Sequence, residues 1–186
     1  MCSGAINHPR QSHKLNPIMI IALTGFMASG KTTFGRAAAG RLGWTFVDLD
    51  DEIARRYGAP AEIFASQGET RFREIESQML AEALHAESDT VLALGGGTIL
   101  REENLRLVKA KATLIWLDTD YDIILSELGN ADRPILNHRT PEQIRALYDE
   151  RRPLYAAAAD FIFPVRQTDY AQVIEDLAES IRRITA

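Results

Sequence analysis

Short runs of apolar residues recur along this chain, and each run is followed by a stretch whose apolar residues have helical spacing. The runs are almost continuously apolar, which is typical of strands that are buried on both faces of a sheet. We predict five such strands, at residues 19–23, 44–50, 90–94, 112–117 and 161–165. The second of these begins as a strand and ends in carboxylates.

Helices are predicted in the intervening stretches. The one that follows Thr140 has an N-cap threonine, a first-turn proline and a capping-box glutamine, and we expect a kink at Pro153. The predicted helices cover residues 33–42, 51–57, 61–67, 68–85, 102–109, 120–128, 140–159 and 170–184.

The alternation of strands and helices predicts the fold class. It is typical of an α/β three-layer sandwich, in which helices cover both faces of a five-stranded parallel sheet. A length of 186 residues fits one domain, which we place at residues 18–186, after a flexible tail at residues 1–17. Ligands of such sheets bind beyond the carboxyl ends of the strands, so motifs at those ends are the first candidates for a site.

Composition and charge narrow the class of function. The net charge is −5, which argues against a nucleic-acid partner, and no apolar run approaches the length of a membrane span. Cys2 is the single cysteine, so no intramolecular disulfide can form, as in a reducing cytosol. Residues 1–17 lack the apolar segment of a secretory signal, and the four histidines lack metal-ligand spacing. We expect a cytoplasmic protein without a zinc site.

The strand at residues 19–23 leads into the motif G-x-x-x-x-G-K-T, from Gly25 to Thr32. Glycines let successive backbone N–H groups converge on phosphate oxygens at the start of a helix. Lys31 would contact the β- and γ-phosphates of a nucleotide, and the Thr32 hydroxyl would ligate Mg²⁺. The flanking strand and helix favour this phosphate-binding loop (P-loop) over a glycine turn that carries a lysine by chance.

Two carboxylates, Asp48 and Asp50, follow the second strand. Alternation along an extended chain would direct both side chains the same way. One could support Mg²⁺ through water, and the other could accept a proton from a substrate hydroxyl. The alternative is that these acids merely favour the start of a helix.

Arg73 and Glu76 are three residues apart in the helix predicted at 68–85, so their side chains can meet on one face. An arginine braced by a carboxylate is a preorganised fork for a substrate carboxylate. The alternative is a solvated, charged helix face.

Gly95, Gly96 and Gly97 follow the strand at 90–94. Such a run brings bare backbone close to a neighbour, and its N–H groups could hold a carboxylate or phosphate. The alternative is a plain loop.

Arg133 lies in a polar loop at residues 129–139, and Arg151 lies close to Pro153. A loop that carries an arginine suits a lid that brings positive charge onto a transferring phosphoryl group when it closes. Arg151 could bind a second oxygen of the substrate.

Taken together, these motifs resemble shikimate kinases, small P-loop kinases of the nucleoside monophosphate kinase-like fold. The matching segments, in order, are GFMASGKTT, VDLDDEI, IFASQGETRFREIE, LALGGGTIL, DRPIL and ERRPLY, and they span nearly all of the chain beyond the tail. The resemblance implies transfer of the ATP γ-phosphate to the 3-hydroxyl of shikimate, in aromatic amino-acid biosynthesis. Mg²⁺ is the implied cofactor, and ATP and shikimate are the expected partners of a monomer.

The resemblance also implies a role for each motif residue. Asp50 would bind shikimate hydroxyls and act as the base, while Asp48 would support the metal shell through water. The lid residue Arg133 would close over the phosphoryl group. The implied nucleotide contacts are Ala28, Ser29, Gly30, Lys31, Thr32, Thr33 and Arg133. The implied shikimate contacts are Asp50, Arg73, Gly95, Gly96, Gly97 and Arg151, with both arginines on the carboxylate.

The chain departs from the family pattern at two positions. Ala28 stands where the family usually has glycine, and alanine resists a positive φ. Ser126 stands where many members have an arginine that stacks on adenine, so we expect weaker nucleotide binding. Two alternatives to shikimate phosphorylation stay open: a related kinase for another polyhydroxy acid, and a non-catalytic binding module that kept the fold.

Overall fold

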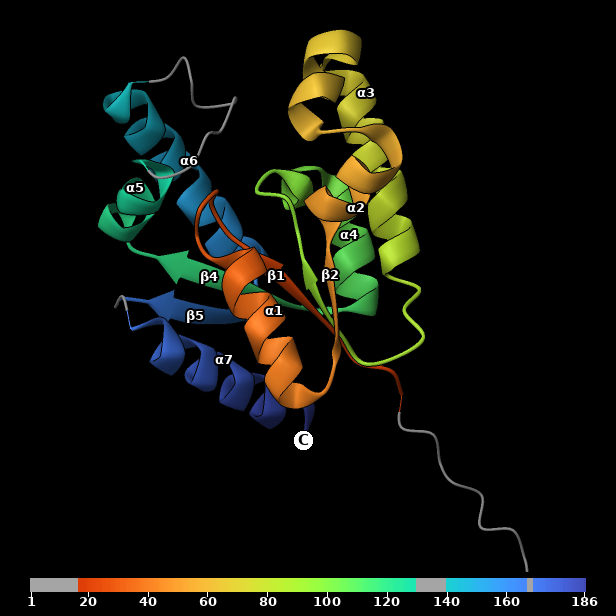
Figure 1. The fold of residues 1–186 in the computed structure, drawn as a ribbon, viewed down its shortest axis with the longest axis vertical. Coiled ribbons are helices and arrows are strands. Elements are labelled where there is room, and N and C mark those ends of the chain that lie inside the picture. The colour runs from red at the N-terminus through yellow and green to blue at the C-terminus, as the bar shows by residue number, and fades with distance from the viewer. Residues whose placement is uncertain (1–16, 130–139, 167–168) are drawn as a thin grey trace, which may run out of the picture.

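Five parallel strands form one sheet in the order β2-β3-β1-β4-β5 (Figure 1). The computed structural model describes residues 17–129, 140–166 and 169–186. The strands are β1 (Ile20–Thr24), β2 (Thr45–Asp48), β3 (Thr90–Ala93), β4 (Thr113–Thr119) and β5 (Phe161–Val165). The predicted fold class, an α/β sandwich around a five-stranded parallel sheet, is therefore confirmed.

The helices lie at the predicted places with small shifts at their ends. They are α1 (Lys31–Leu42), α2 (Leu49–Tyr57), α3 (Pro60–Ala83), α4 (Glu102–Lys111), α5 (Tyr121–Gly129), α6 (Pro141–Ala158) and α7 (Tyr170–Thr185), with a short 3₁₀ turn, η1 (Thr98–Leu100). The two helices predicted on either side of Gly68 form one element, α3, with a non-helical residue at Gly68.

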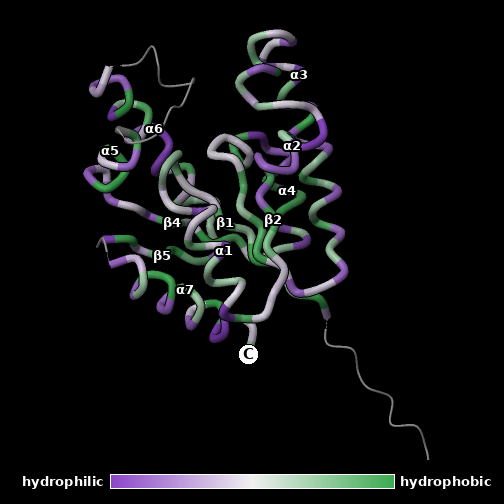
Figure 2. The backbone as a smooth tube through the Cα atoms, viewed as in Figure 1, coloured by the Kyte–Doolittle hydropathy of each residue, from purple (hydrophilic) through white to green (hydrophobic). Residues whose placement is uncertain are grey.

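Two hydrophobic clusters cover the two faces of the sheet. Along β1, Ile20 and Ala22 belong to one cluster, while Ile21 and Leu23 belong to the other. The first cluster takes its helical residues mainly from α2, α3, α4, α5 and α6, and the second from α1 and α7. Because successive side chains of a strand point to opposite faces, a strand between two helical layers must be apolar throughout. Figure 2 shows the apolar strands at the centre of the molecule.

Local sequence determines where several helices begin. The Thr140 hydroxyl accepts a hydrogen bond from the Gln143 N–H, and the Gln143 side chain caps the Thr140 N–H in return, so the predicted capping box is confirmed. At α2, Asp48 is the N-cap and its carboxylate accepts from the N–H groups of Asp50 and Asp51. The premise that Asp48 and Asp50 lie on one extended strand is therefore wrong, because the helix already begins at Leu49.

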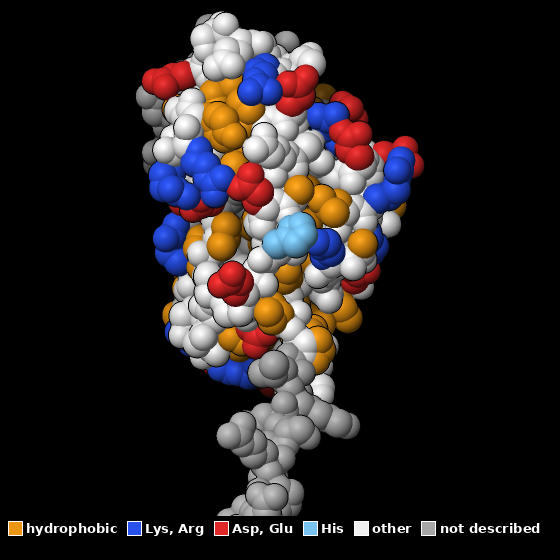
Figure 3. Space-filling model, turned by 90° about the vertical axis from the view of Figure 1, so that its right-hand side faces the viewer, with side chains coloured by type: hydrophobic (Ala, Val, Ile, Leu, Met, Phe, Trp, Pro, Cys, Tyr) orange, Lys and Arg blue, Asp and Glu red, His pale blue; other side chains and the backbone are white. Residues whose placement is uncertain are grey.

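The surface of the described part of the chain is mixed in charge. On the face shown in Figure 3, lysine and arginine side chains are interspersed with aspartate and glutamate. Among the described helices, none combines the length and the apolar character that crossing a bilayer requires. Residues 1–16 of the expected tail and residues 130–139 of the expected lid, with Arg133, lie outside the described residues.

Candidate active site

Three of the predicted motifs meet at one edge of the sheet. All five strands are parallel, so the P-loop after β1, the aspartates after β2 and the three glycines after β3 leave the same edge. If a side chain is added at Gly96, its Cβ would lie 3.5 Å from both the Gly25 carbonyl oxygen and the Met27 nitrogen. The glycine segment therefore packs directly against the P-loop.

The P-loop holds its curled shape through residues with positive φ. Gly30 has φ of 88° and is the N-cap of α1. The first turn of α1 contains no acidic residue. The positive end of the helix is thus open toward an anion. Ala28 also has a positive φ, of 59°, a conformation that the glycine usual in the family could adopt without strain. This left-handed conformation costs an alanine about 1–2 kcal/mol, so the strain expected there is present.

Lys31 lies inside the curl of the loop. Its Nζ donates to the carbonyl oxygens of Gly25 at 3.0 Å and Phe26 at 2.8 Å, and to the Ser29 hydroxyl at 3.4 Å. These contacts hold the ammonium group at the mouth of the phosphate cradle. A point charge in this place is suited to β- and γ-phosphate oxygens.

Thr32 and Asp48 bring hard oxygen ligands together beside the loop. The Thr32 hydroxyl donates to Asp48 Oδ2 at 2.6 Å, while Asp48 Oδ1 accepts from the Asp50 N–H at 3.0 Å. Mg²⁺ prefers hydroxyl, carboxylate and phosphate oxygens and keeps several of its waters. This pair supplies the kind of oxygen atoms that a nucleotide-bound Mg²⁺ takes as ligands.

The three glycines each face a different functional group. A Cβ at Gly95 would lie 3.0 Å from Asp50 Oδ1, and a Cβ at Gly97 would lie 3.0 Å from both terminal nitrogens of Arg73. The Gly96 carbonyl accepts from the Tyr155 hydroxyl at 2.5 Å. At Gly95 and Gly97 the side chains of the site occupy the space that a Cβ would take, whereas a Cβ at Gly96 would meet only backbone atoms at ordinary contact distance.

Arg73 and Glu76 form the predicted ion pair, at 2.9 Å, and it is not a solvated pair. The Glu76 side chain is 1% exposed and the Arg73 side chain 22% exposed. By contrast, the neighbouring pair Arg71–Glu74 is about half exposed on both sides. The sequence spacing is the same in both pairs, so only the packing distinguishes the braced arginine from a surface one.

Arg151 approaches the site from α6. Burial raises the pKa of Tyr155, and Arg151 acts against that rise, which puts its guanidinium near the phenol ring. Since the Tyr155 hydroxyl is bonded to Gly96, Arg151 lies on the side of α6 that faces the glycine segment.

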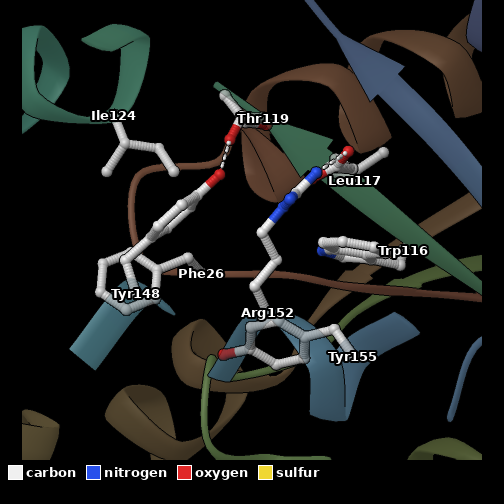
Figure 4. Close-up of a pocket in the computed structure, with 9 residues that line it drawn as sticks. Phe26, Trp116, Leu117, Thr119, Ile124, Tyr148, Arg152 and Tyr155 are labelled. Carbon is white, nitrogen blue, oxygen red and sulfur yellow. Dashed lines mark hydrogen bonds and ion pairs between the residues drawn. The ribbon is translucent and has the colours of Figure 1, made fainter. Parts of the chain in front are cut away.

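The structure also shows supporting residues that the sequence analysis missed. Thr119, at the end of β4, donates its hydroxyl to the Ser29 carbonyl at 3.0 Å, and its own carbonyl accepts from Tyr148 at 3.0 Å. Figure 4 shows Tyr148 pointing at Thr119 in this way. These bonds fasten the P-loop to β4 and α6. The two bonds join residues that are 90 and 29 positions apart in the sequence, so no local sequence pattern could reveal them.

A small pocket behind the P-loop is filled by a second ion-pair network. Arg152 lies across Trp116 in Figure 4 and makes a two-pronged contact with Asp118, at 3.0 Å on each oxygen. Arg166 also contacts Asp118. Burial alone would raise the pKa of Asp118, but the two arginines hold that pKa below its usual range. We assign this network a structural role, because it ties α6 and the end of β5 to β4.

A P-loop, a paired hydroxyl and carboxylate, and a half-buried arginine with a buried glutamate partner lie at one edge of a parallel sheet. They define the class of the protein: a small-molecule kinase that uses a nucleotide. Comparison with known proteins narrows the class. The model of the family described as "Shikimate kinase" matches residues 27–182. The chain belongs to the shikimate kinase family.

Individual relatives agree with that assignment. The shikimate kinase of Moorella thermoacetica is 39% identical over 164 residues, which are 87% of this chain and 94% of the relative. The one from Bradyrhizobium diazoefficiens is 39% identical over 87% of this chain and 79% of its own length. Among solved structures, the shikimate kinase from Acinetobacter baumannii in complex with shikimate is 34% identical, with a TM-score of 0.80 over 90% of this chain and 93% of that one.

Proposed function

We propose that the protein transfers the γ-phosphoryl group of ATP to the 3-hydroxyl of shikimate, giving shikimate 3-phosphate and ADP. The observation that carries this proposal is the pair of half-buried Arg73 and buried Glu76, at 2.9 Å, beside a P-loop. An arginine whose charge is braced in this way is suited to a small carboxylated substrate placed next to a nucleotide. Membership of the shikimate kinase family favours this function over both alternatives.

The nucleotide would bind at the P-loop. Backbone N–H groups from Ala28 to Thr33 would hold the phosphates, with Lys31 as the charged contact. Thr32 and Asp48 would hold Mg²⁺, which neutralises the charge that develops on the phosphates. We place the monomeric enzyme in the cytoplasm, as a single-cysteine chain suits a reducing compartment.

The acceptor would bind over the three glycines. Arg73 and Arg151 approach this segment from α3 and α6, and we assign both to the substrate carboxylate. Asp50, beside Gly95, would accept the proton of the attacking hydroxyl. That hydroxyl oxygen forms a bond to the γ-phosphorus while the bond to the β–γ bridging oxygen breaks, and ADP leaves with the released electron pair. Arg133, from the lid, would stabilise the charge on the phosphoryl group.

A coupled ADP-release assay tests this function. We expect ADP release with shikimate to exceed release with quinate or gluconate, because the chain belongs to the shikimate kinase family. Faster release with quinate or gluconate would establish the related-kinase alternative. No acceptor-dependent release with any of the three, from folded protein that binds ATP, would establish the binding-module alternative.

A further inference from the structure

Glu76 is a buried carboxylate with two partners, and only one of them is an arginine. Its Oε2 accepts from Arg73 at 2.9 Å, and its Oε1 accepts from the Thr98 hydroxyl at 2.7 Å. Thr98 is fully buried and Glu76 is 1% exposed, so water does not satisfy either oxygen. A carboxylate in such a place needs both hydrogen bonds to keep one orientation.

We propose that Thr98 is a positioning residue for the acceptor's carboxylate: by fixing Glu76, its hydroxyl sets the angle at which Arg73 meets the substrate. The inference rests on the proposed function, since Arg73 must be the carboxylate receptor. It adds a residue that makes no contact with substrate and acts only through two others.

The surroundings of Arg73 show why its angle depends on Glu76. The guanidinium lies over the Phe72 ring at 5.3 Å, against the bare backbone of Gly97, and one of its terminal nitrogens reaches Glu76. Its other terminal nitrogen makes only a 3.4 Å contact with Glu69, whose side chain is 69% exposed. An exposed partner at that distance is readily exchanged for a substrate carboxylate. Among the residues that the structure describes, Glu76 is therefore the one buried ion-pair partner of this arginine.

Thr98 is itself firmly held. Its N–H donates to the Gly95 carbonyl at 3.1 Å, and its carbonyl accepts from the buried Asn104 side chain, on α4, at 3.0 Å. The hydroxyl thus occupies a fixed place between the glycine segment and α3. A series of hydrogen bonds therefore connects Asn104 on α4 to Thr98, Thr98 to Glu76, and Glu76 to Arg73. It links the glycine segment to the arginine of the proposed acceptor site.

Removing the Thr98 hydroxyl would break the hydrogen bond to Glu76. In the variant Thr98→Val the shape of the side chain is kept, but Glu76 Oε1 loses its donor inside the protein. The carboxylate would then turn to share both oxygens with Arg73, in the two-pronged geometry that the pair prefers. The nitrogen meant for the substrate would be drawn away from it.

The experiment compares two acceptors. One is shikimate, and the other is its neutral analogue, in which the carboxylate is reduced to a hydroxymethyl group. For Thr98→Val we expect KM for shikimate to rise about tenfold, while KM for ATP and kcat/KM for the neutral analogue change less than about twofold. Thr98→Ser, which restores a hydroxyl, should recover most of the preference for shikimate.

A matched control and a reference variant complete the test. Thr90→Val removes a buried hydroxyl that donates to the Ser88 carbonyl at 2.8 Å, at the opposite end of β3, and should leave the preference unchanged. Arg73→Met should abolish the preference. If it does not, Arg73 is not the receptor and the proposed site falls, and the inference with it.

Suppose that Arg73→Met abolishes the preference, but Thr98→Val lowers kcat/KM equally for both acceptors or for neither of them. That result overturns the positioning role of Thr98 and leaves the proposed function standing. Should Thr98→Val not fold, as judged by circular dichroism, Thr98→Ala and Thr98→Ser provide the same contrast. Equal preferences in those two variants would then overturn the role.

Discussion

The nucleotide end and the acceptor end that we propose for this site lie side by side. The first would bind its substrate mainly through backbone groups, and the second mainly through side chains. At the nucleotide end the chain offers backbone: a curled loop, a helix start and one lysine that is bonded to two carbonyls. At the acceptor end it offers side chains, with Arg73, Glu76 and Thr98 packed against glycines. Backbone recognition tolerates an unusual residue such as Ala28, at a cost in strain. The acceptor end has less freedom, because a Cβ at Gly95 or Gly97 would lie within 3.0 Å of the Asp50 or Arg73 side chain.

The largest expected effect is at the nucleotide end, at the lysine of the P-loop. Lys31→Ala should lower kcat by more than about 1,000-fold, since it removes the charge that faces the transferring phosphate. The protein should stay folded, because Lys31 is not part of the hydrophobic core and its three hydrogen bonds described above lie within the P-loop. Steady-state kinetics with circular dichroism measures both. Lys111→Ala, an exposed lysine that contacts His85, is the control. Activity within tenfold of the unaltered protein would remove Lys31 from the mechanism.

Asp50 stands between the two ends, so its substitution tests how separate they are. Asp50→Asn should lower kcat by about 100- to 10,000-fold, the usual contribution of a general base. KM for ATP should change little, because we assign the metal contacts to Thr32 and Asp48, which are hydrogen-bonded to each other at 2.6 Å. The neighbouring Asp51→Asn, which removes an exposed pair with Arg36, should keep its activity. Equal losses in turnover and in ATP affinity would assign Asp50 to the metal instead.

Packing at the acceptor end can be broken with one methyl group. Gly97→Ala would place a Cβ 3.0 Å from the Arg73 guanidinium and should raise KM for shikimate by about tenfold, with KM for ATP unchanged. The matched control is Gly40→Ala in α1, where an added Cβ meets nothing within 4 Å. That change should stabilise the protein by about 0.5–1 kcal/mol. A rise in both KM values would mean that the glycine segment serves both ends alike.

The comparison also explains what could be predicted from the sequence. Local spacing predicts the P-loop and the Arg73–Glu76 pair. The rule that ligands bind at the carboxyl ends of parallel strands predicts that the motifs after those strands meet at one edge of the sheet. Thr98, Thr119 and Asp118 did not follow, because their partners lie 22, 90 and 34 residues away. Asp48 does end β2, but Asp50 was wrongly interpreted as lying on the same extended chain, because the sequence there suits either state and α2 begins at Leu49. Tertiary packing decided each of these cases.

Base recognition at the nucleotide end can be strengthened. Ser126 lies exposed on α5, and its hydroxyl donates to the Ile123 carbonyl at 2.8 Å. Ser126→Arg should tighten ATP binding by about 0.5–2 kcal/mol if an arginine there stacks on adenine. Titration calorimetry measures the change. Leu125→Arg adds the same charge at a neighbouring exposed position, and equal gains in the two variants would mean attraction by charge alone.

The smallest effect concerns the strain that backbone recognition leaves in the P-loop. Ala28→Gly should raise the free energy of unfolding by about 0.5–1 kcal/mol, because relief of the φ of 59° outweighs the entropy that glycine adds to the unfolded chain. Ala37→Gly, inside α1, has no strain to relieve and should lower the same quantity by about 1 kcal/mol. Urea denaturation of the two variants distinguishes them by the sign of the change. A loss at Ala28 as large as the loss at Ala37 would show that the loop carries no strain at that residue, and that alanine is as suited to it as glycine.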